Sequence, residues 1–134
     1  MATLRIMEWN ANGLLQHQHE LQVILCSENI DICLISETHL TKESFIRFKN
    51  YSTYHSIHPA NTARGGSAVI IKNNIKHFEE EKYVTYDIQA TVVTIETTKQ
   101  KYKVSAIYCP PRYNMYEGEY KTFFNKLLYY WRRL

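Results

Sequence analysis

A short apolar run that ends in a carboxylate constrains the fold of this chain more than any other feature. Residues 32–36 read ICLIS, and Glu37, Thr38 and His39 follow directly. An apolar run with β-branched members is typical of a strand that is buried on both faces. The polar residues after it have two readings: the chain has reached the surface, or a rigid strand end presents catalytic groups.

The segments before this run predict a strand–helix–strand unit. Residues 4–10 are β-prone and lead into the turn-forming sequence NANG. In residues 18–28, leucine and isoleucine recur at helical spacing. A strand, a helix and a strand at this spacing predict a right-handed βαβ unit with parallel strands. Because parallel strands end at the same sheet edge, we expect Asn10 and Glu37 to lie there together.

The rest of the sequence predicts further strands and a closing helix. Strand patterns occupy residues 51–57 and 66–72, and the clearest hairpin joins residues 87–97 to residues 101–109. Residues 116–131 repeat aromatic residues and leucine at a period of 3.6, which predicts an amphipathic helix that covers a sheet. The pattern as a whole indicates an α/β fold.

Length and charge exclude some classes of protein. The 134 residues are enough for one domain, and no apolar run approaches the roughly 20 residues that span a bilayer. The N-terminus lacks the pattern of a signal peptide. From Lys99 onward, eight basic residues stand against two acidic ones. This skew suits a polyanionic partner such as DNA, and it equally suits a solvated surface.

The three cysteines indicate a reducing compartment. Cys26, Cys33 and Cys109 lie in or beside apolar runs and lack the close spacing of a zinc site. Buried free thiols are the expected state, because cysteines that stay unpaired are typical of reducing compartments. We therefore expect an intracellular protein without a membrane partner.

Each polar residue near a strand end also has a structural reading. Asn10 suits a turn, Glu37 suits a surface position, and Tyr108 suits a core position with its hydroxyl paired. His39 suits a loop, and Arg64 precedes a Gly-Gly pair, which is common in hairpin turns. Only the combination and order of these residues are informative.

Four motifs occur in one order: WNANG, SETHL, RGGSAVIIK and IYCPP. Together they resemble the endonuclease/exonuclease/phosphatase superfamily, and within it the apurinic-endonuclease-like endonuclease domain of jockey-type non-LTR retrotransposons. In those elements the domain precedes a reverse transcriptase. The resemblance covers about residues 4–124. It implies the N-terminal half of the four-layer α/β sandwich of DNase I-like nucleases, which we expect as one mixed sheet flanked by helices.

The resemblance also implies roles for the matching residues. Glu37 matches the metal-binding glutamate and would hold Mg²⁺, with Mn²⁺ as the alternative ion. Asn10 matches the asparagine that sits beside the metal and orients the scissile phosphate. Tyr108 matches the tyrosine whose hydroxyl reaches that phosphate. Loop residues at the DNA-facing edge would contact phosphate or sugar, namely Asn12, Thr38, His39 and Arg64.

Two catalytic motifs of the family do not occur in this sequence. The family activates water with an Asp-x-Asn motif and supports it with a Ser-Asp-His motif, and neither is found in the 134 residues. A whole domain needs roughly 220 residues or more. Residues 1–134 are therefore expected to form a single domain whose C-terminal half is absent. Such a half-domain would expose one sheet face and self-associate through it. The face carries Val93, Ile95, Val104 and Ala106.

Two functions follow from these expectations. The first is an Mg²⁺-dependent DNA endonuclease domain of a retrotransposon, which nicks target sites in the nucleus and is weak or inactive as a half-domain. The second is a decayed or co-opted half-domain that binds nucleic acid or protein without catalysis. A phosphatase of inositol lipids or a sphingomyelinase shares the fold, but the ETHL and RGG surroundings resemble the retrotransposon branch.

Overall fold

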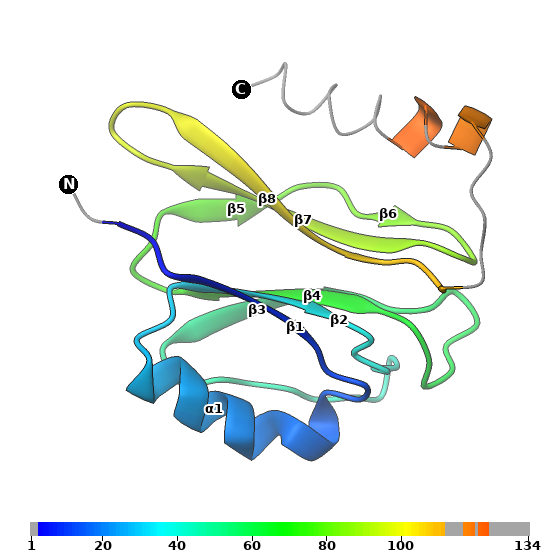
Figure 1. The fold of residues 1–134 in the computed structure, drawn as a ribbon, viewed down its shortest axis with the longest axis horizontal. Coiled ribbons are helices and arrows are strands. Elements are labelled where there is room, and N and C mark those ends of the chain that lie inside the picture. The colour runs from blue at the N-terminus through cyan, green and yellow to red at the C-terminus, as the bar shows by residue number, and fades with distance from the viewer. Residues whose placement is uncertain (1–2, 112–116, 120, 124–134) are drawn as a thin grey trace.

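The computed structural model describes residues 3–111, 117–119 and 121–123. Its strands form two four-stranded sheets that pack face to face (Figure 1). The α/β class is therefore confirmed, whereas the prediction of one sheet is wrong. Among the described residues, no helix has the length and apolar content needed to cross a bilayer.

Sheet A is mixed and contains the predicted βαβ unit. Its strands follow the order β1 (Ile6–Asn10), β2 (Ile32–Ser36), β4 (Ser67–Lys72) and β3 (Tyr51–Ser56). β1 and β2 are parallel, and the other two pairs are antiparallel. A 3-10 turn (Leu15–His17) and helix α1 (Gln18–Ser27) connect the two parallel strands.

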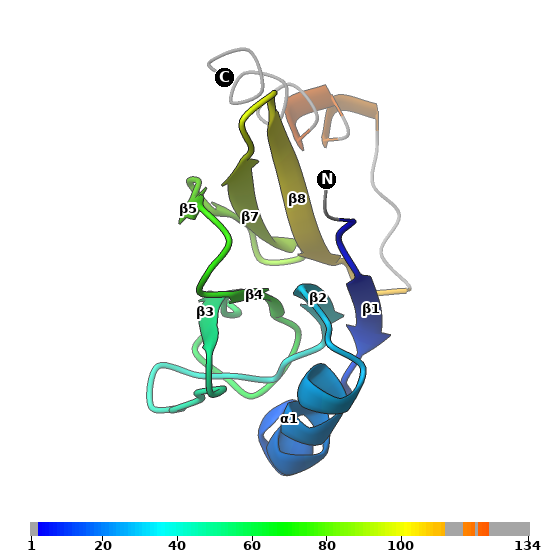
Figure 2. The ribbon, with the colours of Figure 1, turned by 90° about the vertical axis from the view of Figure 1, so that its left-hand side faces the viewer.

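Helix α1 covers the outer face of sheet A. Leu21 and Leu25 are buried and pack in one cluster with Cys33, Ile35 and Ile70 of the sheet. Figure 2 shows α1 and sheet B on opposite sides of sheet A. Of the residues whose spacing predicted the helix, the two leucines form the face that it buries, whereas Ile24 is 39% exposed.

Sheet B is built around the predicted hairpin. β7 (Gln89–Glu96) pairs along its whole length with β8 (Lys101–Tyr108). Two short strands, β5 (His77–Glu79) and β6 (Tyr83–Val84), pair with the other edge of β7. β5 has three residues and β6 has two. Strands this short do not produce a periodic sequence pattern, so they were not predicted.

The face that was expected to be exposed lies between the two sheets. Val93, Ile95 and Ala106 are buried there, and Val104 is partly buried. The expectation failed because the chain turns back after β4 and places sheet B on the inner face of sheet A. This face is therefore not available for self-association.

The interior between the sheets changes polarity along the strands. The apolar end consists of Ile32, Val69, Ile71, Val93 and Ile95, each 1% exposed or less. The polar end consists of Ser56, Ser67, Gln89 and Thr91, which are equally buried. Thr91 Oγ1 lies 2.8 Å from Ser56 Oγ and 2.9 Å from Ser67 Oγ, so the hydroxyl groups pair across the sheets.

The last described residues lie on the outer face of sheet B. Residues 117–119 and 121–123 are helical, and the remainder of the helix predicted at 116–131 lies outside the described residues. Phe123 packs with Ile88 and Ala90, and its ring centroid is 5.0 Å from that of Tyr83.

Candidate active site

The parallel pairing of β1 and β2 brings Asn10 and Glu37 to one edge of sheet A. Asn10 stands opposite Ser36 in the strand register. The loop after β1 continues the pairing, because Gly13 N donates a hydrogen bond to Glu37 O at 2.9 Å. The predicted proximity of the two residues is confirmed, and it follows from strand direction.

Gly65 lets sheet B approach this edge. His39 N donates to Gly65 O at 2.9 Å, which joins the loop after β2 to the loop before β4. Gly65 has a φ of +56°, and a Cβ there would lie 2.5 Å from Gln89 Oε1 and 3.1 Å from Tyr108 Cε2. Because glycine has no Cβ, the Tyr108 ring and the Gln89 amide can lie against its backbone.

Tyr108 is the last residue of β8 and is half-buried beside Gly65. Burial raises the pKa of its hydroxyl, and the negative charge of Glu37 raises this pKa further, while Arg64 acts in the opposite direction. The hydroxyl therefore lies in the field of both charged groups. A phenol is already protonated at neutral pH at its ordinary pKa, and the raised pKa extends this state to higher pH, so the hydroxyl can donate a hydrogen bond.

Strained backbone occurs in the loops that carry these residues. Asn12, Glu37 and His39 have φ values of 45°, 56° and 55°. Asparagine and histidine are enriched in this left-handed region, whereas glutamate rarely adopts it. Such conformations persist where the surroundings impose them. Here the hydrogen bonds of the Glu37 and His39 backbones to neighbouring loops fix the direction in which the Glu37 side chain leaves the strand.

Thr38 differs from the other predicted substrate contacts. It is 1% exposed, and a Cβ on Gly66 would collide with its Oγ1. Among the described residues its hydroxyl has no hydrogen-bond partner. We therefore assign Thr38 to packing rather than to DNA contact. Asn12 and Arg64 are exposed and His39 is half-buried, so the placement of these three agrees with the prediction of a loop surface.

Sequence reasoning missed Gln89, which is fully buried at the polar end. Its Oε1 accepts a hydrogen bond from Gly66 N at 3.0 Å, and its Nε2 donates to Thr85 O at 3.0 Å and to Tyr86 O at 3.3 Å. The sequence did carry a signal, because Gln89 interrupts a β-branched strand pattern. A buried amide needs partners on both atoms, and here it joins two loops.

Arg64 is held against Tyr86, a residue that carried no sequence signal. The Arg64 guanidinium carbon lies 5.0 Å from the ring centroid, and Nη2 donates a hydrogen bond to the Tyr86 hydroxyl. The ring of buried His58 meets the Tyr86 ring edge to face at 4.6 Å. The pKa of His58 is lowered by burial and by the positive charge of Arg64, so this imidazole is neutral at neutral pH.

The donor set at the sheet edge contains one carboxylate and one amide. Asn10 Oδ1 accepts a hydrogen bond from Asn12 N at 3.2 Å, which orients the amide beside Glu37. Within residues 3–111, 117–119 and 121–123, no three His, Cys, Asp or Glu side chains are grouped to hold a metal. Oxygen donors with a single carboxylate still fit Mg²⁺, which retains several water ligands and commonly binds one or two carboxylates with substrate phosphates.

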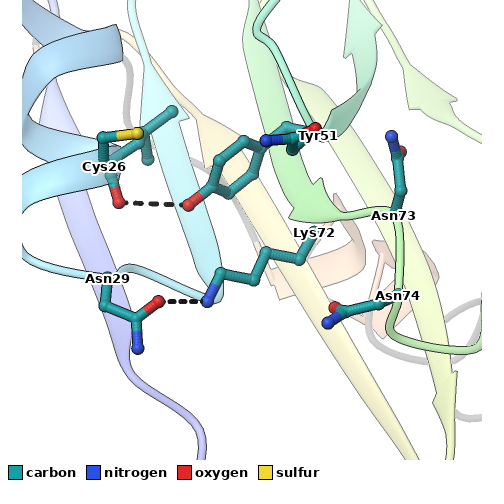
Figure 3. Close-up of a pocket in the computed structure, with 8 residues that line it drawn as sticks. Cys26, Asn29, Tyr51, Lys72, Asn73 and Asn74 are labelled. Atoms are coloured by element: carbon teal, nitrogen blue, oxygen red, sulfur yellow. Dashed lines mark hydrogen bonds between the residues drawn. The ribbon is translucent and has the colours of Figure 1, made fainter.

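A groove of about 420 Å³ lies at the opposite edge of sheet A (Figure 3). Its Lys72 pairs with Asp31 at 3.2 Å and donates to the Asn29 side chain. The Tyr51 hydroxyl donates to Leu25 O at 3.1 Å. These polar groups are already paired, which favours a structural junction between α1 and the strands over a second site.

The sequence is similar to a described family and to proteins of mobile elements. The model of the Endonuclease/Exonuclease/phosphatase family matches residues 7–132. This chain is 33% identical to the RNA-directed DNA polymerase from mobile element jockey of Drosophila funebris, over 91% of its residues. It is 37% identical to the polymerase of the same name from Drosophila melanogaster, over 93% of its residues. The chain spans 13% and 14% of the length of these two relatives.

The fold is similar to those of solved endonucleases. The endonuclease domain of TRAS1, a telomere-specific non-LTR retrotransposon, matches 92% of this chain and 53% of its own, with a TM-score of 0.70 and 16% identity. The AP endonuclease LMAP from Leishmania major matches 78% of this chain and 40% of its own, with a TM-score of 0.61 and 14% identity. At these identities the likeness shows a shared fold.

Proposed function

The chain belongs to the endonuclease/exonuclease/phosphatase family, and from this premise we propose that it forms the metal- and phosphate-binding side of an Mg²⁺-dependent DNA endonuclease site. One observation carries the proposal: Asn10 at the end of β1 and Glu37 directly after β2 lie at one edge of sheet A, and the charge of Glu37 reaches the hydroxyl of Tyr108 at the end of β8 in sheet B. Further support is that the Tyr108 ring packs where only a glycine, Gly65, leaves room, and that Glu37 has a strained backbone.

Glu37 and Asn10 would hold the ion. The carboxylate supplies the charged ligand, and the amide, oriented by Asn12 N, supplies a neutral oxygen or contacts the phosphate beside the ion. When bound, Mg²⁺ offsets the negative charge of the phosphate and of the departing oxygen. Mn²⁺ suits the same oxygen donors.

Tyr108 would donate a hydrogen bond to a non-bridging phosphate oxygen. Its hydroxyl is protonated at neutral pH, and its ring packs against the backbone of Gly65. A donor that is fixed before the substrate arrives stabilises the charge that builds on phosphate during hydrolysis. Arg64, Asn12 and His39 lie in the surrounding loops and would contact neighbouring phosphates or sugars.

The relatives suggest the biological setting. Two of them are polymerases from mobile element jockey, so we propose that this chain serves a non-LTR retrotransposon. Its substrate would be chromosomal DNA at the insertion site, which places its action in the nucleus. A reverse transcriptase would then use the nicked strand.

The chain is proposed to be weak or inactive by itself. In-line attack on phosphate needs a group that activates water, and the sequence contains neither an Asp-x-Asn nor a Ser-Asp-His motif. This observation also favours the second candidate function, a half-domain that binds nucleic acid or protein without cleaving it. The two functions differ in whether a metal-dependent reaction occurs at Glu37.

Nicking of supercoiled plasmid by the purified chain tests the proposal. We expect slow nicking in Mg²⁺ that is absent in EDTA and absent in Glu37→Gln, which keeps the shape of the side chain and loses its charge. Glu28→Gln is the matched control, because the Glu28 side chain is exposed and pairs with Arg5 at 3.5 Å, away from the sheet edge that carries Glu37. Equal background nicking by wild type and Glu37→Gln would leave the binding function as the better description.

A further inference from the structure

The Arg64–Tyr86 pair has features that a surface contact does not need. Tyr86 is 59% exposed, yet buried residues contact both its backbone and its ring. Gln89 donates to its carbonyl, and neutral His58 supports its ring. An exposed tyrosine that is anchored at two points presents a rigid surface to whatever lies on it.

The same buried amide also fixes the loop that carries Arg64. Gln89 Oε1 accepts from Gly66 N at 3.0 Å, two residues after Arg64. Arg64 and Tyr86 are 22 residues apart in the sequence, but the Gln89 side chain links their two loops by hydrogen bonds. Their contact is therefore set by the packing of the two sheets and not only by the attraction between cation and ring.

The pair borders the candidate active site. Gly65, the residue after Arg64, lies against the Tyr108 ring, and the charge of Arg64 reaches the Tyr108 hydroxyl. An arginine with a free side chain loses much rotamer entropy when it binds a phosphate. An arginine that is already held on a fixed ring loses less of this entropy. Only one side-chain N–H of Arg64 is used by the Tyr86 hydroxyl, and the exposed guanidinium has further donors for a phosphate.

We infer that Tyr86 is a positioning residue that holds the Arg64 guanidinium ready for one DNA phosphate next to the phosphate bound by Tyr108. The inference rests on the proposed DNA endonuclease function and adds a residue to it. Tyr86 acts through Arg64 and makes no essential DNA contact of its own. Its effect on DNA binding must therefore depend on the presence of Arg64.

A double-mutant cycle on DNA binding tests this dependence. The full chain binds a short fluorescein-labelled duplex in EDTA, and anisotropy gives the affinity at several salt concentrations. We expect Arg64→Ala to lower the slope of log K against log salt by about 1, the value for one phosphate contact. We expect Tyr86→Ala to weaken binding by about two- to fivefold at unchanged slope, the range for an exposed cation–π contact.

The decisive arm is Tyr86→Ala in the Arg64→Ala background, where we expect no further weakening. Tyr86→Phe keeps the ring and loses the hydroxyl acceptor, so it should fall between wild type and Tyr86→Ala and is available if Tyr86→Ala misfolds. Tyr102→Ala is the matched control: Tyr102 is also exposed and also accepts a side-chain hydrogen bond, but it lies six residues before Tyr108 on β8, roughly 20 Å away.

The outcomes separate the inference from the proposed function. Equal weakening in both backgrounds would mean that Tyr86 contacts DNA itself, and unchanged or tighter binding by Tyr86→Ala would mean that it does not prepare Arg64. Either result overturns the inference and leaves the endonuclease proposal standing. Failure of the wild-type chain to bind the duplex at low salt overturns both.

Discussion

The two ends of the sandwich interior use opposite chemistry. The apolar end is filled with isoleucine and valine, which gain free energy from burial without needing partners. The polar end buries hydroxyl groups and an amide, each of which must find a partner or lose stability. The comparison indicates a division of roles: the apolar end stabilises the fold, and the polar end fixes the positions of loops.

The loops above the polar end also contain strained backbone. Glu37, His39, Gly65 and Gly66 all have positive φ there, and a glutamate rarely adopts this conformation. Strained residues need surroundings that determine their geometry, and directional hydrogen bonds supply this better than apolar contacts do. The candidate active site therefore lies next to the part of the core in which hydrogen bonds fix the positions of the loops.

The largest effect on stability is expected from the apolar end. Ile71→Ala removes a fully buried side chain, and we expect it to lower the free energy of unfolding by about 2–5 kcal/mol. Urea denaturation measures this loss. Phe45→Ala is the control, because Phe45 is 78% exposed and its removal should change stability by less than about 0.5 kcal/mol. A loss below that level for Ile71→Ala would contradict the assigned role of the apolar end.

A smaller loss is expected from the polar end. Gln89→Met keeps the approximate size of the side chain but removes the partner of Gly66 N and the donor to two carbonyls. We expect a loss of about 1–3 kcal/mol, together with weaker DNA binding. Gln100→Met, in the exposed turn between β7 and β8, should change neither quantity. Intact DNA binding by Gln89→Met would show that the amide does not organise the site.

The strain at Glu37 predicts a further difference. Glu37→Gly and Glu37→Ala both remove the carboxylate, but only glycine adopts a φ of 56° freely. We expect Glu37→Gly to be more stable than Glu37→Ala by about 1 kcal/mol, and both to lack Mg²⁺-dependent nicking. Thermal and urea unfolding of the two variants measure the difference. If Glu37→Ala were the more stable variant, the loop would not hold Glu37 in the left-handed conformation.

The smallest expected effect concerns alkaline pH. The pKa of Tyr108 is raised in the folded state by burial and by Glu37, so its contribution to stability is complete below the unfolded value near 10. The contribution declines as pH rises through the folded pKa, because the unfolded chain loses the proton first. Tyr108→Phe should therefore show a shallower alkaline decline in unfolding free energy. Burial also raises the pKa of Tyr51, so some decline should remain.

Local patterns predicted most of the strands and the helix between the first two. Alternation and apolar runs are properties of single segments, so the βαβ unit and the β7–β8 hairpin were visible in the sequence. The edge shared by Asn10 and Glu37 followed from strand direction. The proposal that this site binds metal and phosphate came from the order of four motifs, which no single residue could supply.

Contacts between distant segments were decided only in three dimensions. The sequence could not show which face of β7 packs onto sheet A. Both faces of this strand are apolar enough to be buried, so its sequence pattern does not distinguish them. The burial of Thr38, the two-sided contacts of Gln89 and the pairing of Arg64 with Tyr86 all depend on that packing. The sequence by itself determined which segments form strands and which polar groups stand at their ends. The tertiary structure decided which of those groups meet, because their meeting depends on the distance between sheets and on the strained loops that join them.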